Sequence, residues 1–243
     1  MAKHISRSEL KKDEILDTFT HGAEAVRSHQ RSAWLIGGVA LLIVAAVLGW
    51  RFYTQRQTVK ASADLADAMR VYQARIRTVN EPADPGELTY VDEKNKYTDA
   101  AKKFSDVAAR YSRTQPGKMA RYYAALSLAG AEKYDEAVAN LKTLESDSDE
   151  GFAALARFQL AQIYEKTGKD AQAVPLYQQL IDKPTVFVPK VVALLALADH
   201  YAKSDPAQAA KLYNQIKTEY PDTQAAQQAD QRLQLLQLVP AKS

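Results

Sequence analysis

The residues with the clearest chemical potential in this chain of 243 residues form an acidic run, ESDSDEG, at positions 145–151. Closely spaced carboxylates are the oxygen ligands that Ca²⁺ prefers. The run lacks the Asp-x-Asp-x-Asp-Gly order and the following Glu of a calcium-binding loop. We therefore interpret it as a solvated loop between helices, and we predict no metal site.

Other reactive groups are scarce. Cysteine is absent, which excludes disulfides and thiol catalysis. His4, His21 and His29 precede the apolar stretch described below and only His200 follows it, so a histidine metal cluster is not expected in the larger C-terminal part. The sequence has no glycine-rich phosphate loop, GxSxG motif or HExxH motif. We predict no catalytic residue, no cofactor and no small-molecule substrate, and hence no enzyme.

The charge distribution argues against nucleic-acid binding. The chain carries 32 basic and 29 acidic residues, and residues 86–243 carry 20 of each. A nucleic-acid-binding surface usually needs a basic stripe. We therefore predict protein partners and no nucleic acid.

A long apolar stretch lies near the N-terminus. Residues 33–50 contain no charge and are enclosed by Arg31 and Arg51. As a helix, residues 33–53 would measure roughly 31 Å, close to the ~30 Å hydrocarbon core of a bilayer. Aromatic residues stand at both ends, with Trp34 at one and Trp50 at the other, as is typical of a membrane interface. These features predict a single transmembrane helix over residues 33–53.

Two other interpretations of this stretch predict different patterns. A buried helix of a soluble domain would show polar positions at helical spacing, and a cleaved signal peptide would have a shorter core followed by small residues. Neither pattern is present, so we favour a permanent anchor. The charges flanking it point weakly to a cytoplasmic C-terminal part, and long domains cross regardless of charge, so the charges leave the orientation open.

The C-terminal two-thirds repeat with a period of 36 residues. ARYYAALSL (120–128) corresponds to ARFQLAQIY (156–164), and AQAVPLYQQLI (171–181) corresponds to AQAAKLYNQIK (207–217). Each unit is predicted to be two amphipathic helices with small residues where they cross and bulky residues beside them. This pattern resembles the tetratricopeptide repeat. The small positions are Ala125, Ala137, Ala161, Ala173 and Ala209; the bulky ones are Leu128, Leu141, Tyr164, Tyr177 and Tyr213.

An atypical first repeat is predicted over residues 54–117, ahead of the repeats at 118–221. Its first helix is expected at 56–80, where apolar residues alternate at spacings of four and three, and its second at 97–111. The Pro- and Gly-containing residues 80–90 should form a loop. The same spacing suits a coiled-coil dimer, but we favour packing within the chain. The apolar positions are Leu65, Met69, Tyr72, Ile76 and Val79.

The two ends of the chain have different patterns. Residues 222–243 predict a capping helix and tail, with Ala225, Ala229, Leu233 and Leu236 on one face. Residues 1–32 form an N-terminal tail with a capping-box pattern at Ser6 and predict a short, partly frayed helix; a docking element is the alternative.

A partner-binding groove is predicted along the first helix of each repeat. Three apolar residues occupy equivalent steps, and a second row follows one turn later. If these rows face outward, they suit an apolar protein segment; if they face inward, they belong to the core. The first row is Tyr122, Phe158 and Leu195, and the second is Leu126, Gln162 and Asp199.

These expectations combine into an all-α chain: one transmembrane helix, a tetratricopeptide-like α-solenoid of about three and a half repeats, and a capping helix. With the segment YPDTQAAQQA (220–229), the combination resembles the YfgM-type ancillary subunits of the SecYEG translocon over roughly residues 30–238. Their repeat domain is shared with a cell-division coordinator. The segment is also similar to outer-membrane assembly lipoproteins, although this chain has no lipobox cysteine.

The resemblance implies a bacterial inner-membrane protein with a cytoplasmic N-terminus and a periplasmic repeat domain. Its implied role is an adaptor or chaperone for exported proteins near the translocon, with translocon and periplasmic proteins as partners. Two alternatives remain open at this point: a scaffold for envelope assembly or cell division that binds one defined partner, and a membrane-anchored enzyme or enzyme regulator.

Overall fold

The structure is a computed structural model that describes residues 30–82 and 84–238. Within that part the chain is all-α, with nine helices and two strands of two residues each. It divides into two compact units, residues 1–56 and residues 57–243. The elements are α2 (Gln30–Tyr72), β1 (Arg75–Ile76), β2 (Thr89–Tyr90), α3 (Glu93–Arg110), α4 (Gln115–Gly130), α5 (Tyr134–Glu145), α6 (Glu150–Lys166), α7 (Asp170–Asp182), α8 (Lys190–Ser204), α9 (Pro206–Glu219) and α10 (Gln224–Leu238).

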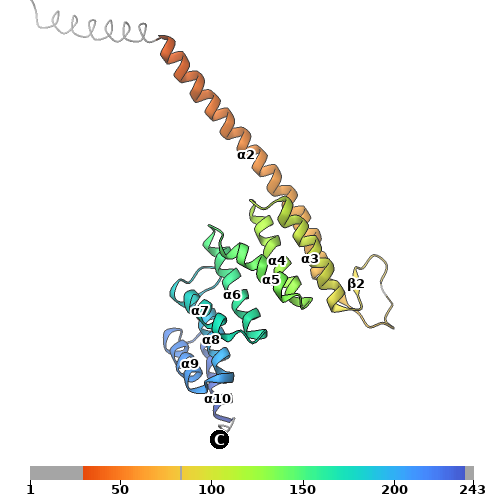
Figure 1. Cartoon of the computed structure of the whole chain (residues 1–243), viewed down its shortest axis with the longest axis vertical. Helices are drawn as coiled ribbons and strands as arrows, with labels where there is room; N and C mark the ends of the chain where they lie inside the picture. The colour runs from red at the N-terminus through yellow and green to blue at the C-terminus, as the bar shows by residue number, and fades with distance from the viewer. Residues whose placement is uncertain (1–29, 83, 239–243) are drawn as a thin grey trace, which may run out of the picture. The chain divides into compact units, whose positions relative to one another are not determined.

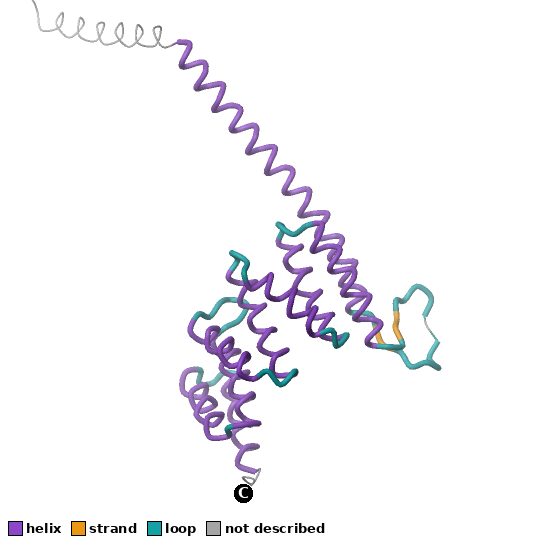
Figure 2. The backbone as a smooth tube through the Cα atoms, viewed as in Figure 1, coloured by secondary structure: helices purple, strands orange, loops and turns teal. Residues whose placement is uncertain are grey.

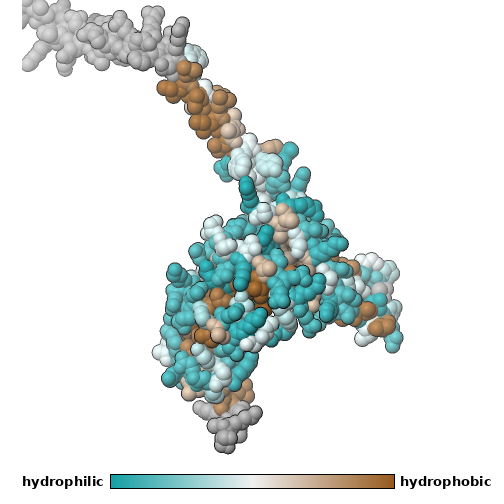
Figure 3. Space-filling view, in the orientation of Figure 1, coloured by the Kyte–Doolittle hydropathy of each residue, from teal (hydrophilic) through white to brown (hydrophobic). Residues whose placement is uncertain are grey.

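The described part of the first unit is the N-terminal portion of α2. Among the described helices, the part Trp34–Tyr72 is long and apolar enough to cross a membrane; its most apolar 18-residue window has a mean hydropathy of 2.1 and none of it is buried. The side chains of its N-terminal part form a mostly brown surface in Figure 3, with Trp34 77% exposed. Contact of this surface with an apolar environment would be more favourable than contact with water. The helix predicted in the tail 1–32 lies largely outside the described residues.

The second unit consists of successive antiparallel helix pairs. The C-terminal part of α2 packs with α3, and the pairs α4–α5, α6–α7 and α8–α9 follow, with α10 against α8 and α9 (Figures 1 and 2). From α3 to α10 each helix contacts the next in the chain, as expected of a solenoid. The predicted capping helix is confirmed: Ala229 is fully buried, and Ala225, Leu233 and Leu236 pack against the same cluster.

Short polar residues begin several of these helices. Asp149 accepts hydrogen bonds from the main-chain N–H groups of Gly151 and Phe152 at the start of α6. Thr114 and Asp205 cap α4 and α9 in the same way, and the Oγ1 atom of Thr223 accepts from the N–H group of Ala226 at the start of α10. Each cap satisfies a donor that the helix leaves unpaired.

The turns between the two helices of a repeat have the same backbone conformation in two repeats. Glu132 after α4 and Gly168 after α6, which are 36 residues apart, both have positive φ angles of 64° and 70°. In each case the next N–H group returns to the helix, from Lys133 to the carbonyl of Leu128 and from Lys169 to that of Tyr164. This is the Schellman arrangement, which reverses the chain into the second helix of the pair.

The core confirms the predicted alternation of small and bulky positions. The five alanines predicted at helix crossings are all fully buried, and each predicted bulky residue is at most 7% exposed. Alanine at a crossing lets two helices approach closely, and the bulky residue one turn away then fills the remaining space. The repeat pattern therefore reflects packing.

The first repeat differs from the prediction at one point. The helix expected to reach residue 80 ends at Tyr72, and Arg75–Ile76 instead pairs in parallel with Thr89–Tyr90. Leu65, Met69 and Tyr72 pack against the cluster that contains Phe104, as predicted for intramolecular packing. Ile76 and Val79 do not: they are 40% and 79% exposed. The periodic apolar residues continue past Tyr72, but Ile76 and Val79 do not pack against the cluster, so they do not lengthen the helix.

Candidate functional site

A cleft of about 430 Å³ opens between the second and third regular repeats. Its lining comes from four helices and combines apolar side chains with amides and charged groups. Such a mixture suits a ligand with both apolar and polar parts. The lining residues are Phe158, Gln162 and Glu165 of α6, Tyr177 of α7, Val192, Leu195, Ala196, Asp199, His200 and Lys203 of α8, and Gln228 of α10.

Four of the six predicted groove residues line this cleft together. Phe158 and Gln162 lie one turn apart on α6, and Leu195 and Asp199 lie one turn apart on α8. The two apolar residues are half-buried, and Gln162 is exposed. Phe158 also packs its ring against that of Tyr177, with centroids 6.0 Å apart, which holds it in place beneath the cleft.

The other two predicted residues lie elsewhere. Tyr122 and Leu126 of α4 are half-buried and do not contribute to the cleft. Tyr122 packs against the central hydrophobic cluster, with its ring 5.7 Å from that of Tyr123. Burial, with smaller contributions from Tyr123 and Tyr72, raises the pKa of the Tyr122 hydroxyl to about 12. This side chain therefore contacts the core, as that of Phe158 also does.

One wall of the cleft is a hydrogen-bonded chain of three side chains. One carboxylate oxygen of Glu165 accepts a hydrogen bond from the Tyr177 hydroxyl at 2.8 Å. The other oxygen lies 2.7 Å from Nδ1 of His200. Tyr177 is fully buried, and the His200 side chain is only 9% exposed. A carboxylate with partners on both oxygens is held in one orientation.

A second carboxylate is held in a similar way. Asp199 accepts a short hydrogen bond, at 2.5 Å, from the hydroxyl of the buried Tyr213, and Arg232 of α10 lies 3.4 Å from its other oxygen. Burial, followed by the bonds to Glu165 and Asp199, raises the pKa values of Tyr177 and Tyr213 above the ordinary value of about 10. Both phenols therefore remain hydrogen-bond donors to these carboxylates at neutral pH.

Sequence reasoning missed the roles of Glu165 and His200. Tyr177 and Tyr213 are equivalent in the repeat, and this signal was visible. Their acceptors are not equivalent: Asp199 matches Gln162, whereas Glu165 stands almost one turn further along α6. A pattern of equivalent positions therefore could not reveal which acid each tyrosine binds.

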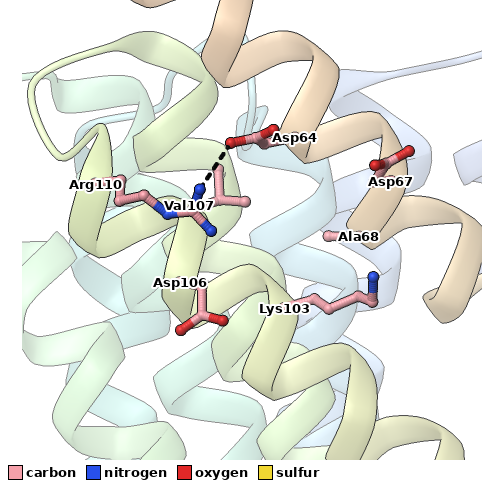
Figure 4. A pocket seen from close by; sticks show the side chains of 7 residues that line it. All are labelled: Asp64, Asp67, Ala68, Lys103, Asp106, Val107 and Arg110. Carbon is pink, nitrogen blue, oxygen red and sulfur yellow. Dashed lines mark hydrogen bonds and ion pairs between the residues drawn. The ribbon is translucent and has the colours of Figure 1, made fainter.

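A smaller cavity of about 150 Å³ lies between the C-terminal part of α2 and α3 (Figure 4). It is lined mainly by charged residues, and one of them, Asp64, is already occupied by Arg110 at 3.3 Å and the Tyr111 hydroxyl at 3.0 Å. Charges that already neutralise one another leave little for a ligand. The lining consists of Asp64, Asp67, Ala68, Lys103, Asp106, Val107 and Arg110.

Acidic residues of the run at 145–151 stabilise the fold through a helix cap and an ion pair. Asp149 caps α6, and Asp147 pairs with Lys118 of α4. The Lys118 hydrogen bond, helped by the N–H group of Asp149, lowers the pKa of Asp147. No group of three or more His, Asp or Glu residues in residues 30–82 and 84–238 is arranged to hold a metal ion.

Stacked helix pairs with a cleft across neighbouring pairs define an α-solenoid protein-interaction module. Comparison with protein families agrees: residues 29–185 match the tetratricopeptide repeat-like domain, and residues 192–223 match the tetratricopeptide repeat. The first match covers more than half of the chain, so the protein belongs to the family of tetratricopeptide repeat-like domains. A search of curated proteins gives no match.

Proposed function

We propose that this protein is a membrane-anchored adaptor or chaperone that binds segments of exported polypeptides near a Sec translocon. The observation that carries the proposal is the cleft between α6 and α8. It combines the apolar side chains of Phe158 and Leu195 with two fixed carboxylates. Apolar side chains of an unfolded segment would pack against Phe158 and Leu195, and polar groups of the same segment would bind the two carboxylates.

The apolar part of α2 supports the membrane component of the proposal. Its exposed surface is long enough to span a bilayer, and in the proposed topology it would anchor the chain in the inner membrane. The N-terminus would be cytoplasmic and the repeats periplasmic. The resemblance to YfgM-type translocon subunits supports this orientation, since the flanking charges do not decide it.

Topology is the first test. A reporter enzyme that is active only outside the cytoplasm is fused after Ser243, and a reporter active only inside is fused at the same position as its control. Activity of the external reporter alone is expected. Activity of the internal reporter alone would exclude an export-linked role and leave a tethered scaffold for cytosolic partners.

Client binding is the second test. A photoreactive amino acid at Gln162 or Gln228, both exposed on the cleft lining, should crosslink to several exported proteins during secretion. The same group at Glu136, exposed on α5 outside the cleft, is the matched control. Leu195→Lys should reduce crosslinking about tenfold, because it places a charge in the apolar part of the cleft, which Phe158 also lines. Crosslinks to one folded protein alone would favour the scaffold function instead.

A further inference from the structure

Residues 73–82 and 84–92, between α2 and α3, form a loop whose parts are joined by hydrogen bonds from a pair of arginines. Arg75 pairs with both Glu81 and Glu87, and Arg77 donates to the carbonyl oxygen of Glu81 at 2.7 Å and to the Thr89 hydroxyl at 3.2 Å. The bonds from Arg75 to Glu87 and from Arg77 to Thr89 link the part of the loop that contains β1 to the part that leads into β2. The loop therefore has a defined surface.

That surface is more apolar than a solvated loop requires. Four large apolar side chains of the loop are at least 40% exposed, and Figure 3 shows their brown surface on the loop that carries β2 in Figure 1. Single exposed apolar residues are ordinary, but a group on one ordered loop marks an interaction surface. The four residues are Ile76, Val79, Leu88 and Val91.

β1 also presents a strand edge. In the described part of the chain this sheet has only two strands, and β2 is the one that contacts α3. The register pairs Ile76 with Tyr90, and the N–H group of Arg77 donates to the carbonyl of Tyr90 at 2.8 Å. In a parallel pair of this register, the N–H and C=O groups of Ile76 point away from β2. Both residues of β1 are exposed, so a further strand could reach this edge.

The charges around this edge favour a basic ligand. Residues 73–92 contain two basic and four acidic residues, a net charge of −2. Both arginines are engaged within the loop, and the exposed carboxylate of Asp84 is among the acids that remain. An anionic lipid surface would be repelled, whereas a lysine or arginine would be attracted.

We propose that this loop, over its described residues 73–82 and 84–92, is a second protein-binding surface, at which an extended partner segment with alternating apolar residues and a basic residue adds as a strand to β1. Main-chain hydrogen bonds to Ile76 supply the pairing, and the exposed apolar side chains select the partner's apolar positions. The acidic surroundings select its charge. This surface lies outside the lining of the cleft between α6 and α8 and does not depend on the function proposed for that cleft.

The test uses the full chain in phosphatidylcholine nanodiscs, with empty nanodiscs as the blank. The probe is a fluorescent peptide of alternating valine and threonine with one central lysine. Fluorescence anisotropy should show binding below about 1 mM, and at least about tenfold weaker binding when the lysine is replaced by glutamate or alternate main-chain nitrogens are methylated.

Two variants locate the site. Ile76→Pro removes the outward N–H group but leaves the bond from Arg77 to Tyr90, and it should weaken binding about tenfold. Val79→Asn should weaken it about threefold, whereas Val186→Asn, at a 95% exposed valine in the α7–α8 loop, should not. Unchanged thermal unfolding by circular dichroism shows that each variant is folded.

Three results would overturn the proposal: no binding at about 1 mM, binding that Ile76→Pro leaves unchanged, or binding to empty nanodiscs alone. A doubling of the molecular mass in light scattering that Ile76→Pro abolishes would also overturn it, because the edge would then belong to a second copy of the chain.

Discussion

Nδ1 of His200 lies 2.7 Å from Oε1 of Glu165, which links α8 to α6 across the wall of the cleft. The side chains are 9% and 19% exposed, and the other oxygen of Glu165 holds the hydroxyl of Tyr177 from α7. Three consecutive helices thus meet at one carboxylate. The cleft and the stability of the two repeats depend on the same group.

Replacing this carboxylate should destabilise the chain. Glu165→Gln keeps the shape but replaces one acceptor oxygen by an NH2 donor, so the hydrogen bonds to Tyr177 and His200 lose the negative charge of the carboxylate and one of them must reverse its direction. We expect a loss of about 1–3 kcal/mol in the free energy of unfolding. Urea unfolding followed by circular dichroism measures it. Glu136→Gln, at an exposed i,i+3 pair with Lys133, is the control and should change stability by less than about 0.5 kcal/mol. Equal effects of the two variants would contradict a structural role for Glu165.

Alkaline pH should unfold the repeats through two buried tyrosines. The pKa values of Tyr177 and Tyr213 are raised in the folded chain, first by burial and then by their hydrogen bonds to carboxylates. Below about pH 9 both folded and unfolded chains keep these protons, so their contribution to stability is fully present. Above about pH 10 the unfolded chain releases them first, so stability should fall by up to about 1.4 kcal/mol per pH unit for each tyrosine.

The measurement is urea unfolding at several pH values between 7 and 11, with phenolate absorbance recorded in parallel. Tyr213→Phe should make the alkaline decline shallower, because one of the two phenols is removed, and should cost about 0.5–1.5 kcal/mol at pH 7 by removing the hydrogen bond to Asp199, which keeps its ion pair with Arg232. A decline of equal slope in wild type and variant would show that other groups cause the alkaline loss.

The helix crossing at Ala173 should reject a larger side chain. Ala173 is fully buried where α7 meets α6, and leucine there would force the two helices apart. Ala173→Leu is expected to cost about 1–3 kcal/mol in the free energy of unfolding. Ala171→Leu, at an exposed position on the same helix, should cost less than about 0.5 kcal/mol. Thermal and urea unfolding of both variants would settle the comparison, and a neutral Ala173→Leu would refute close packing at this crossing.

The turn after α4 should gain stability from glycine. Glu132 has a φ angle of 64°, a conformation that glycine adopts without the Cβ clash, as Gly168 does after α6. Glu132→Gly should therefore stabilise the chain by about 0.5–1 kcal/mol, since its ion pair with Lys94 is long and exposed. The reciprocal change, Gly168→Ala, should destabilise it by about 1 kcal/mol. Effects of the same sign in the two variants would be inconsistent with this account.

Some features of the repeats could be predicted from the sequence without a structure. The small and bulky positions of the repeats were predictable because helix crossings impose the same size limits in every repeat, as Ala137, Ala173 and Ala209 illustrate. The repeat also placed four residues at equivalent steps of α6 and α8, and these four line the cleft: Phe158, Gln162, Leu195 and Asp199. Tyr122 occupies an equivalent step and packs against the same central cluster as Phe158, but it does not line the cleft.

The all-α repeat architecture, the apolar stretch of α2 and the capping helix could be predicted from the sequence, because each depends on periodicity and composition along the chain. The fold was needed to show where α2 ends, which acid each buried tyrosine binds, and that Ile76 and Val79 are exposed. Those outcomes depend on distances between residues far apart in sequence, and a one-dimensional pattern contains no such distances.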